Sequence, residues 1–126
     1  MKKTSSIHSF GYALRGLRFV FLHEKNFRIE CLFTLIILIS FFFLSFSRLE
    51  IIVLLLLCGL VLMSEIINTV AEHFLDVLKP RLSYQVEVVK DILAGLVLLS
   101  VILAIVIGFI IYIPAFIEYI VPFVVQ

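Results

Sequence analysis

Glycine and cysteine are scarce in this chain, and their scarcity excludes two familiar kinds of site. Five of the 126 residues are glycine, at positions 11, 16, 59, 95 and 108. This spacing forms neither a Walker A loop nor a glycine-rich kinase loop, so any phosphate chemistry must use another arrangement. The two cysteines, Cys31 and Cys58, stand apart inside apolar runs and lack the paired spacing of a zinc or redox site. We expect both to be buried free thiols and assign them no role.

Charged side chains are also few. They make up 15% of the chain, against about 25% in an average soluble domain, while hydrophobic residues make up 63%. The mean hydropathy of +1.26 is correspondingly high. This composition predicts an all-α integral membrane protein with a single domain over residues 1–126.

The order of apolar and charged residues predicts four helices. In residues 1–28 the apolar residues from Phe10 to Phe21 recur at helical spacing while basic residues point elsewhere, which is typical of an amphipathic helix in the membrane interface. Three apolar runs follow, and a helix needs roughly 20 such residues to cross a bilayer. The predicted fold is an N-terminal amphipathic interfacial helix plus three transmembrane helices, at 30–47, 51–76 and 87–117.

Basic residues are distributed unevenly, although the formal net charge is only +1. Six of the ten precede the first predicted span, one lies between the first and second, three lie between the second and third, and none follows. By the positive-inside rule, this predicts a cytoplasmic N-terminus, a cytoplasmic loop at 77–90 and a C-terminus outside. The pattern describes topology and does not indicate nucleic-acid binding.

The second predicted span ends in a polar stripe. Five residues fall within an arc of about 100° on a helical wheel, namely Glu65, Asn68, Thr69, Glu72 and Asp76. A carboxylate at a lipid-facing helix centre costs roughly 2.5 to 3.5 kcal/mol, so this face must meet protein, water or a ligand. A merely solvated helix end is the alternative. It suits Asp76 but not Glu65, which directly follows the apolar run.

Depth separates the members of the stripe. If the crossing begins near Ile51, Glu65 lies about 21 Å further along the helix, close to the far boundary of the hydrocarbon layer. Glu72 lies about 10 Å beyond Glu65, outside that layer. A lipid hydroxyl would therefore meet Glu65, and a water-soluble cosubstrate could reach Glu72 and Asp76.

Carboxylates with an asparagine and a lysine at this boundary match the needs of phosphoryl transfer. That reaction uses a base for the attacking hydroxyl, oxygen ligands for Mg²⁺ and a cation for the phosphates. A different class remains open, a non-catalytic membrane subunit or a small ion carrier, but the sites of such carriers usually lie near the bilayer midplane. The position of the stripe at one interface favours chemistry between a lipid and a soluble donor.

These residues also resemble a known family. The run Glu65-Ile66-Ile67-Asn68-Thr69, followed by Glu72 and Asp76 and then by Lys90-Asp91, is similar to the signature of the small bacterial diacylglycerol kinase and undecaprenol kinase family. Upstream, residues 12–18 and 24–30 resemble the family's amphipathic helix and the entry to its first span. The resemblance covers nearly the whole chain.

The resemblance implies an ATP- and Mg²⁺-dependent lipid kinase of the bacterial cytoplasmic (inner) membrane, a homotrimer with active sites shared between subunits. It implies Glu65 as the general base and Glu24 and Glu72 as the metal-bridging carboxylates. The implied contacts to the nucleotide are Tyr12, Glu24, Asn68, Glu72, Lys90 and Asp91. The residues implied to support the lipid or the site geometry are Arg15, Arg18, Glu30 and Asp76.

The sequence leaves two candidates for the acceptor lipid, and both are alcohols. Diacylglycerol and undecaprenol both present a primary hydroxyl at the interface. Residues 26–29 and Asn68-Thr69 look closer to the undecaprenol branch of the family, whereas Glu30 is similar to the diacylglycerol branch. Diacylglycerol, converted to phosphatidic acid, is the predicted acceptor, and undecaprenol, converted to undecaprenyl phosphate, is the alternative.

Overall fold

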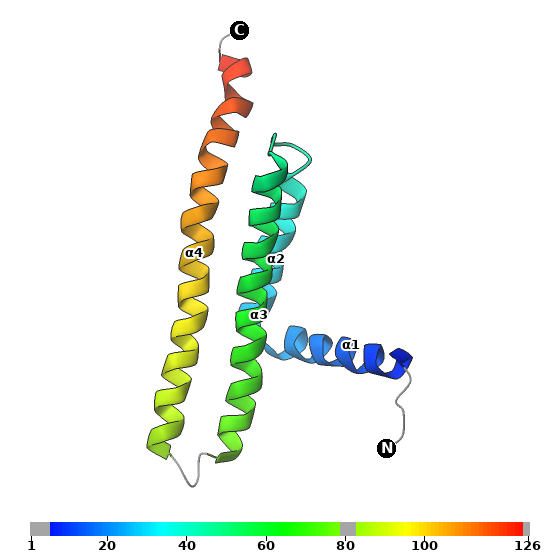
Figure 1. Ribbon diagram of the computed structural model, residues 1–126, viewed down its shortest axis with the longest axis vertical. Coiled ribbons are helices and arrows are strands. Elements are labelled where there is room, and N and C mark those ends of the chain that lie inside the picture. The colour runs from blue at the N-terminus through cyan, green and yellow to red at the C-terminus, as the bar shows by residue number, and fades with distance from the viewer. Residues whose placement is uncertain (1–5, 79–82, 125–126) are drawn as a thin grey trace.

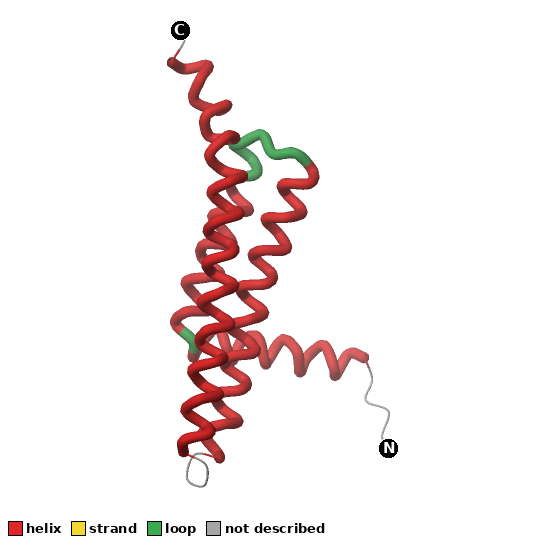
Figure 2. The backbone as a smooth tube through the Cα atoms, turned by 60° about the vertical axis from the view of Figure 1, so that its left-hand side comes forward, coloured by secondary structure: helices red, strands yellow, loops and turns green. Residues whose placement is uncertain are grey.

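The computed structural model describes residues 6–78 and 83–124, and the regular structure in these ranges is entirely helical. The helices are α1 (Ser6–His23), α2 (Lys25–Ser40), α3 (Arg48–Leu78) and α4 (Ser83–Val124). The long helices α3 and α4 run side by side, α2 packs along α3, and α1 extends away from the bundle near the start of α2 (Figure 1). The turned view in Figure 2 shows the same arrangement. The all-α prediction is confirmed for these ranges.

The corner between α1 and α2 comes earlier than predicted. Helix α1 ends at His23, and Glu24 adopts an extended conformation before α2 begins at Lys25. The Arg28 guanidinium donates hydrogen bonds to the carbonyl oxygens of Phe21 and Leu22, at 3.1 and 2.9 Å. These carbonyls lie in the last turn of α1, where the helix itself supplies no donor. The predicted surface helix at 1–28 therefore ends earlier than predicted, at His23. The next helix begins at Lys25 and not at residue 30.

A second capping contact sets the start of α3. Helix α2 ends at Ser40, and a turn and an irregular segment occupy 41–47. The Ser47 backbone N–H donates to Glu50 Oε2 at 2.7 Å, and the Glu50 backbone N–H donates to Ser47 Oγ at 3.3 Å. This reciprocal pair is a capping box, which stabilises a helix that begins at Arg48. The helix predicted at 30–47 is therefore Lys25–Ser40, and the helix predicted at 51–76 is Arg48–Leu78.

Two helices in the described part of the chain are long and apolar enough to cross a membrane, over Arg48–Val77 and Tyr84–Pro122. Helix α2 has 16 residues and rises about 24 Å, less than the hydrocarbon thickness. Helix α4 exceeds its predicted range of 87–117 at both ends and continues through Pro114 and Pro122. Each proline removes one backbone donor, a loss that helices in membranes tolerate. Residues 79–82 of the predicted loop at 77–90 lie outside the described residues.

The core follows one face of α3. Leu54, Cys58, Val61 and Glu65 recur at helical spacing on this face and are buried. Next to Val61 and Glu65, Ser64 Oγ lies 2.8 Å from Ser100 Oγ and joins α3 to α4. The remaining surfaces of the helices are largely exposed leucine, isoleucine, valine and phenylalanine. This pattern fits an integral membrane protein, whose outer faces contact lipid tails as apolar as themselves.

Both cysteine thiols are free. Cys58 is buried as expected, whereas Cys31 is only half-buried, so the expectation of a buried thiol is wrong for Cys31.

Candidate active site

Glu65 occupies the centre of the candidate site. Only 2% of this residue is exposed, although it lies on the apolar helix α3. The side chain of Asn26, just past the corner between α1 and α2, lies close enough to the Glu65 carboxylate to interact with it as a donor. A buried carboxylate is costly unless such donors satisfy it, so the corner gives Glu65 one partner within its own chain.

Three further carboxylates lie close enough to Glu65 to repel its charge. Glu24 comes from the corner and Glu72 from α3, about two turns after Glu65. Glu30 comes from α2 and interacts with Glu65 in the same way. We call Glu24, Glu30, Glu65 and Glu72 the carboxylate cluster. Such a gathering of like charges is unfavourable unless protons, a cation or polar ligand groups compensate it.

Helix α4 supplies a cation next to this cluster. Lys90 Nζ lies 2.6 Å from Asp76 Oδ1, and the Lys90 charge also interacts with Glu72. On α3 itself, Asn68 Nδ2 donates to Glu72 Oε1 at 3.1 Å. Asp76, Glu72 and Lys90 therefore form one charged group at the end of the bundle near residues 79–82.

Buried polar atoms without a partner concentrate in the same region. Glu30 Oε2, Asn68 Oδ1 and Thr69 Oγ1 are inaccessible and make no hydrogen bond among the described residues. Native proteins leave few such atoms unsatisfied, so each calls for an explanation. A bound ligand or a neighbouring subunit that donates or accepts hydrogen bonds here would satisfy all three.

The structure brings together some of the predicted site residues and not others. The stripe on α3 exists as predicted, and α2 and the corner add Glu24 and Glu30 to it. Tyr12, Arg15 and Arg18 remain exposed on α1, which runs outward from the bundle (Figure 1). The Arg15 guanidinium lies over the Tyr12 ring, 4.7 Å from its centroid. Asp91 is exposed and takes no part in these contacts.

Two residues of the site carried no assigned role from the sequence. Asn26 stands in a polar stretch between Glu24 and Glu30, and that position was the available signal. Thr69 belongs to the predicted stripe and is only 2% exposed. Both side chains became candidates only when the packing of α2 against α3 was known.

Carboxylate oxygens are hard donors of the kind that Mg²⁺ prefers, together with phosphate oxygens and water. Glu24 and Glu72 each interact with Glu65 through their charges, and they are the two residues that would hold such an ion. Within 6–78 and 83–124, no group of three or more His, Cys, Asp or Glu side chains is placed to hold a metal by itself.

Comparisons with known proteins agree on one family. The family described as prokaryotic diacylglycerol kinase matches residues 11–112. A diacylglycerol kinase from Synechocystis sp. is 31% identical over 101 residues, which cover 79% of this chain and 58% of the relative. The undecaprenol kinase of Bacillus subtilis is 29% identical over 106 residues, which cover 84% of this chain and 86% of the relative.

A diacylglycerol kinase from Haemophilus influenzae is 36% identical over 73 residues, 58% of this chain and 62% of the relative. The chain thus spans less than two thirds of the length of the Synechocystis and Haemophilus relatives. No solved structure matches the chain.

Proposed function

The chain belongs to the prokaryotic diacylglycerol kinase family, and we propose on that premise that it transfers the γ-phosphoryl group of ATP to the hydroxyl of a membrane lipid. The observation that carries the proposal is Glu65, a buried carboxylate at the end of the apolar run of α3, whose charge interacts with those of Glu24, Glu30 and Glu72. A lipid hydroxyl held at the membrane boundary meets this carboxylate from the bilayer side. A nucleotide meets Glu72 and Lys90 from the aqueous side.

Glu65 acts as the general base. Its carboxylate accepts the proton of the lipid hydroxyl as the hydroxyl oxygen attacks the γ-phosphorus, the new P–O bond forms, and the bond to ADP breaks. Asn26 donates to the carboxylate and thereby holds it in one orientation. Positioning and charge dominate phosphoryl transfer, so the base contributes part of the acceleration, about 10² to 10⁴-fold.

Glu24 and Glu72 are the proposed ligands of Mg²⁺, which when bound offsets the negative charge of the ATP phosphates. Lys90 supplies a second positive charge beside Glu72. The amide of Asn68 is held by Glu72 and leaves its own oxygen free for a donor on the substrate. Tyr12 and Asp91 complete the proposed nucleotide contacts. Arg15, Arg18, Glu30 and Asp76 support the lipid and the site geometry.

We propose three membrane spans and a homotrimer. Helix α2 together with the turn after it forms the first of these spans, and α1 lies in the interface with its exposed apolar residues, Phe10 among them, in lipid. The N-terminus and residues 77–90, which include the end of α3 and the start of α4, are cytoplasmic in a bacterial inner membrane. The unpaired atoms of the site and the exposed positions of Tyr12, Arg15 and Arg18 on α1 support active sites shared between subunits. Native mass spectrometry that finds an active, stable monomer contradicts the trimer.

Diacylglycerol is the proposed acceptor, supported by the family description and by two of the relatives. Undecaprenol is the second candidate, because the relative of which the chain covers the largest share, 86%, carries that name. The test supplies purified protein in detergent with radiolabelled ATP, Mg²⁺ and each lipid in parallel. Label in phosphatidic acid supports the first acceptor and label in undecaprenyl phosphate the second. If no lipid becomes labelled, the kinase proposal is contradicted. The remaining alternatives are then a non-catalytic membrane subunit and a small ion carrier.

A further inference from the structure

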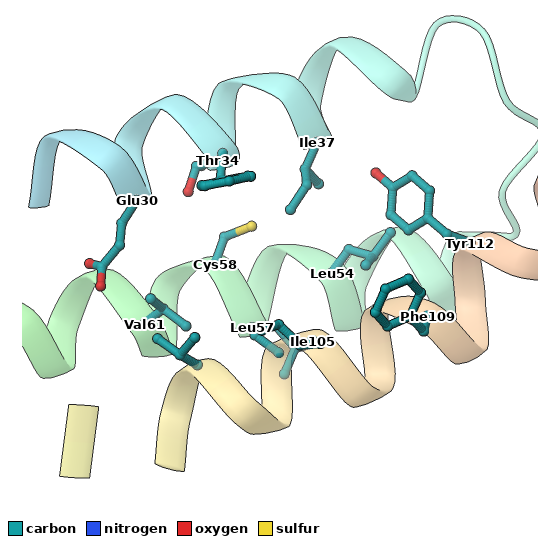
Figure 3. Close-up of a pocket in the computed structure, with 14 residues that line it drawn as sticks. Glu30, Thr34, Ile37, Leu54, Leu57, Cys58, Val61, Ile105, Phe109 and Tyr112 are labelled. Atoms are coloured by element: carbon teal, nitrogen blue, oxygen red, sulfur yellow. The ribbon is translucent and has the colours of Figure 1, made fainter. Parts of the chain in front are cut away.

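An apolar groove runs along the bundle between α2, α3 and α4 (Figure 3). Its volume is about 500 Å³, and its walls are almost entirely aliphatic and aromatic. Phe33, Ile105 and Phe109 line it and are 62%, 51% and 62% exposed, so one side of the groove opens toward the surrounding lipid. From Glu30 to Ser40 on α2 the helix rises about 15 Å, which sets the scale of the groove's length.

The groove begins at the candidate active site. Glu30 lines one end, and its charge interacts with that of Glu65. Its Oε2 atom is buried and has no partner among the described residues. A hydroxyl donated to this end of the groove would satisfy Glu30 within reach of the proposed base. A molecule with a hydroxyl head and an apolar body therefore fits the groove in one direction.

The far end of the groove is closed by a polar pair and aromatic rings. The Tyr112 hydroxyl and Ser40 Oγ are hydrogen-bonded across the gap between α4 and α2. The Phe46 ring meets the Tyr112 ring edge-on with centroids 5.2 Å apart, and Phe41 packs on Phe46 at 5.7 Å. Figure 3 shows Tyr112 and Glu30 at opposite ends, with Thr34 and Cys58 between them. A molecule that lies along the groove with one end beside Glu30 therefore reaches Tyr112 at the other end.

We propose that this groove binds one hydrocarbon chain of the acceptor lipid and that the Ser40–Tyr112 closure limits the length of chain that it holds. This inference rests on the proposed function and adds to it a determinant of chain-length specificity. An α-helix with side chains is about 10–12 Å across, so a helix of another subunit would lie mostly outside a groove of this volume. A single chain of methylene groups fits the smaller space. The apolar walls suit it, since each buried methylene is stabilising.

Gly108 offers a direct way to shorten the groove. It lines the groove one helical turn before Tyr112, and a Cβ built on it meets no atom within 4 Å. The Cβ of a leucine at this position therefore lies in open space, and the rest of the side chain takes up room in the proposed chain site. Gly95 on the same helix also has open space around its Cβ position and does not line the groove, which makes it the matched control.

The experiment compares the parent, Gly108→Leu and Gly95→Leu on diacylglycerols with saturated chains of increasing length, each at equal mole fraction in detergent micelles. The inference predicts that Gly108→Leu lowers kcat/KM for long chains relative to short chains by about tenfold, the expected effect of expelling about two methylene groups from an apolar site. Gly95→Leu should keep the parent's length profile. Tyr112→Ala, which opens the closure, should shift the preference toward longer chains.

The outcomes separate this inference from the proposed function. A parent that phosphorylates no lipid contradicts the kinase proposal and the inference with it. An active parent whose Gly108→Leu variant keeps the parent's length profile overturns the inference alone. A Gly108→Leu variant that changes the oligomeric state while the length profile stays constant also overturns it, because a second copy of the chain then occupies the groove.

Discussion

The two halves of the bundle differ in whether all of their buried polar side-chain atoms have partners among the described residues. In the half that holds the groove, the Ser40 and Tyr112 hydroxyls are hydrogen-bonded to each other, and Thr34 lies close enough to the Cys58 thiol to interact with it. At the charged end, oxygens of three buried side chains have no hydrogen-bond partner among the described residues, namely those of Glu30, Asn68 and Thr69. The paired groups join helices, whereas the unpaired ones lie around a cluster of like charges.

This difference separates packing from chemistry. A hydrogen-bonded pair of hydroxyls in a membrane bundle contributes to helix association and needs no further partner. An unsatisfied buried acceptor costs free energy, and a protein keeps it only where something else completes it. Substitutions at the charged end should therefore change catalysis and leave stability nearly intact, while substitutions of the paired groups should do the reverse.

The largest expected effect is at Glu65. Glu65→Gln keeps an oxygen that can accept from Asn26, and it removes one negative charge from the carboxylate cluster, so folding and assembly should be unchanged. Turnover should fall at least about a hundredfold because the amide accepts no proton. The measurement is phosphoryl transfer at saturating ATP, with native mass spectrometry to check assembly. Glu118→Gln, an exposed change outside the matched family region, is the control.

A Glu65→Gln enzyme that turns over lipid within a few-fold of the parent would contradict the assignment of Glu65 as base. Asp76 and Asp91 would then be the next residues to substitute.

The second effect concerns Mg²⁺. Glu24→Gln and Glu72→Gln should each raise the Mg²⁺ concentration for half-maximal rate by at least about tenfold, or abolish turnover, because an amide is a weaker ligand than a carboxylate. In the Glu72→Gln variant, Asn68 can still donate to the side-chain amide oxygen at position 72, so the local geometry should persist. The measurement is a Mg²⁺ titration at fixed ATP. Parent-like Mg²⁺ dependence in both variants removes these residues from the metal site.

A smaller effect is expected at Thr69. Thr69→Val keeps the shape of the side chain and removes a hydroxyl that has no partner among the described residues, so thermal stability should be equal or higher. If the hydroxyl binds substrate, turnover should fall roughly threefold to tenfold, the value of one hydrogen bond. Thr69→Ser should retain most of the activity. A loss of stability in Thr69→Val with unchanged turnover would place Thr69 among the packing residues.

The smallest effect, at Ser64 and Ser100, should be on stability alone. A double-mutant cycle of Ser64→Ala and Ser100→Ala should give a coupling of about 0.6 kcal/mol, the average for hydrogen bonds between membrane helices. Unfolding in mixed micelles measures this coupling, and phosphoryl transfer should stay near the parent rate. A tenfold loss of turnover in Ser100→Ala would contradict the claim that the paired groups affect stability and not catalysis.

The sequence predicted the helices and the stripe better than it predicted their ends. Periodicity and apolar run length identified the helical segments, since both reflect local backbone geometry and transfer free energy. The ends depended on individual side chains, such as Arg28 at the α1 carbonyls and the Ser47–Glu50 capping box. A contact such as that of Arg28 with a helix it does not belong to leaves no periodic signal.

What the sequence by itself determined was an apolar, all-helical chain with a polar face on the helix that follows residue 50, because helical spacing alone places Glu65, Asn68, Thr69 and Glu72 on one side. Only the tertiary structure decided what that face meets. The corner at Glu24 brings Asn26 to Glu65, α2 brings Glu30, and α4 brings Lys90 beside Glu72. The closure of the groove by Ser40 and Tyr112 likewise joins residues 72 positions apart. These contacts depend on how separate helices pack, and side chains distant in sequence acquire partners only when that packing is made.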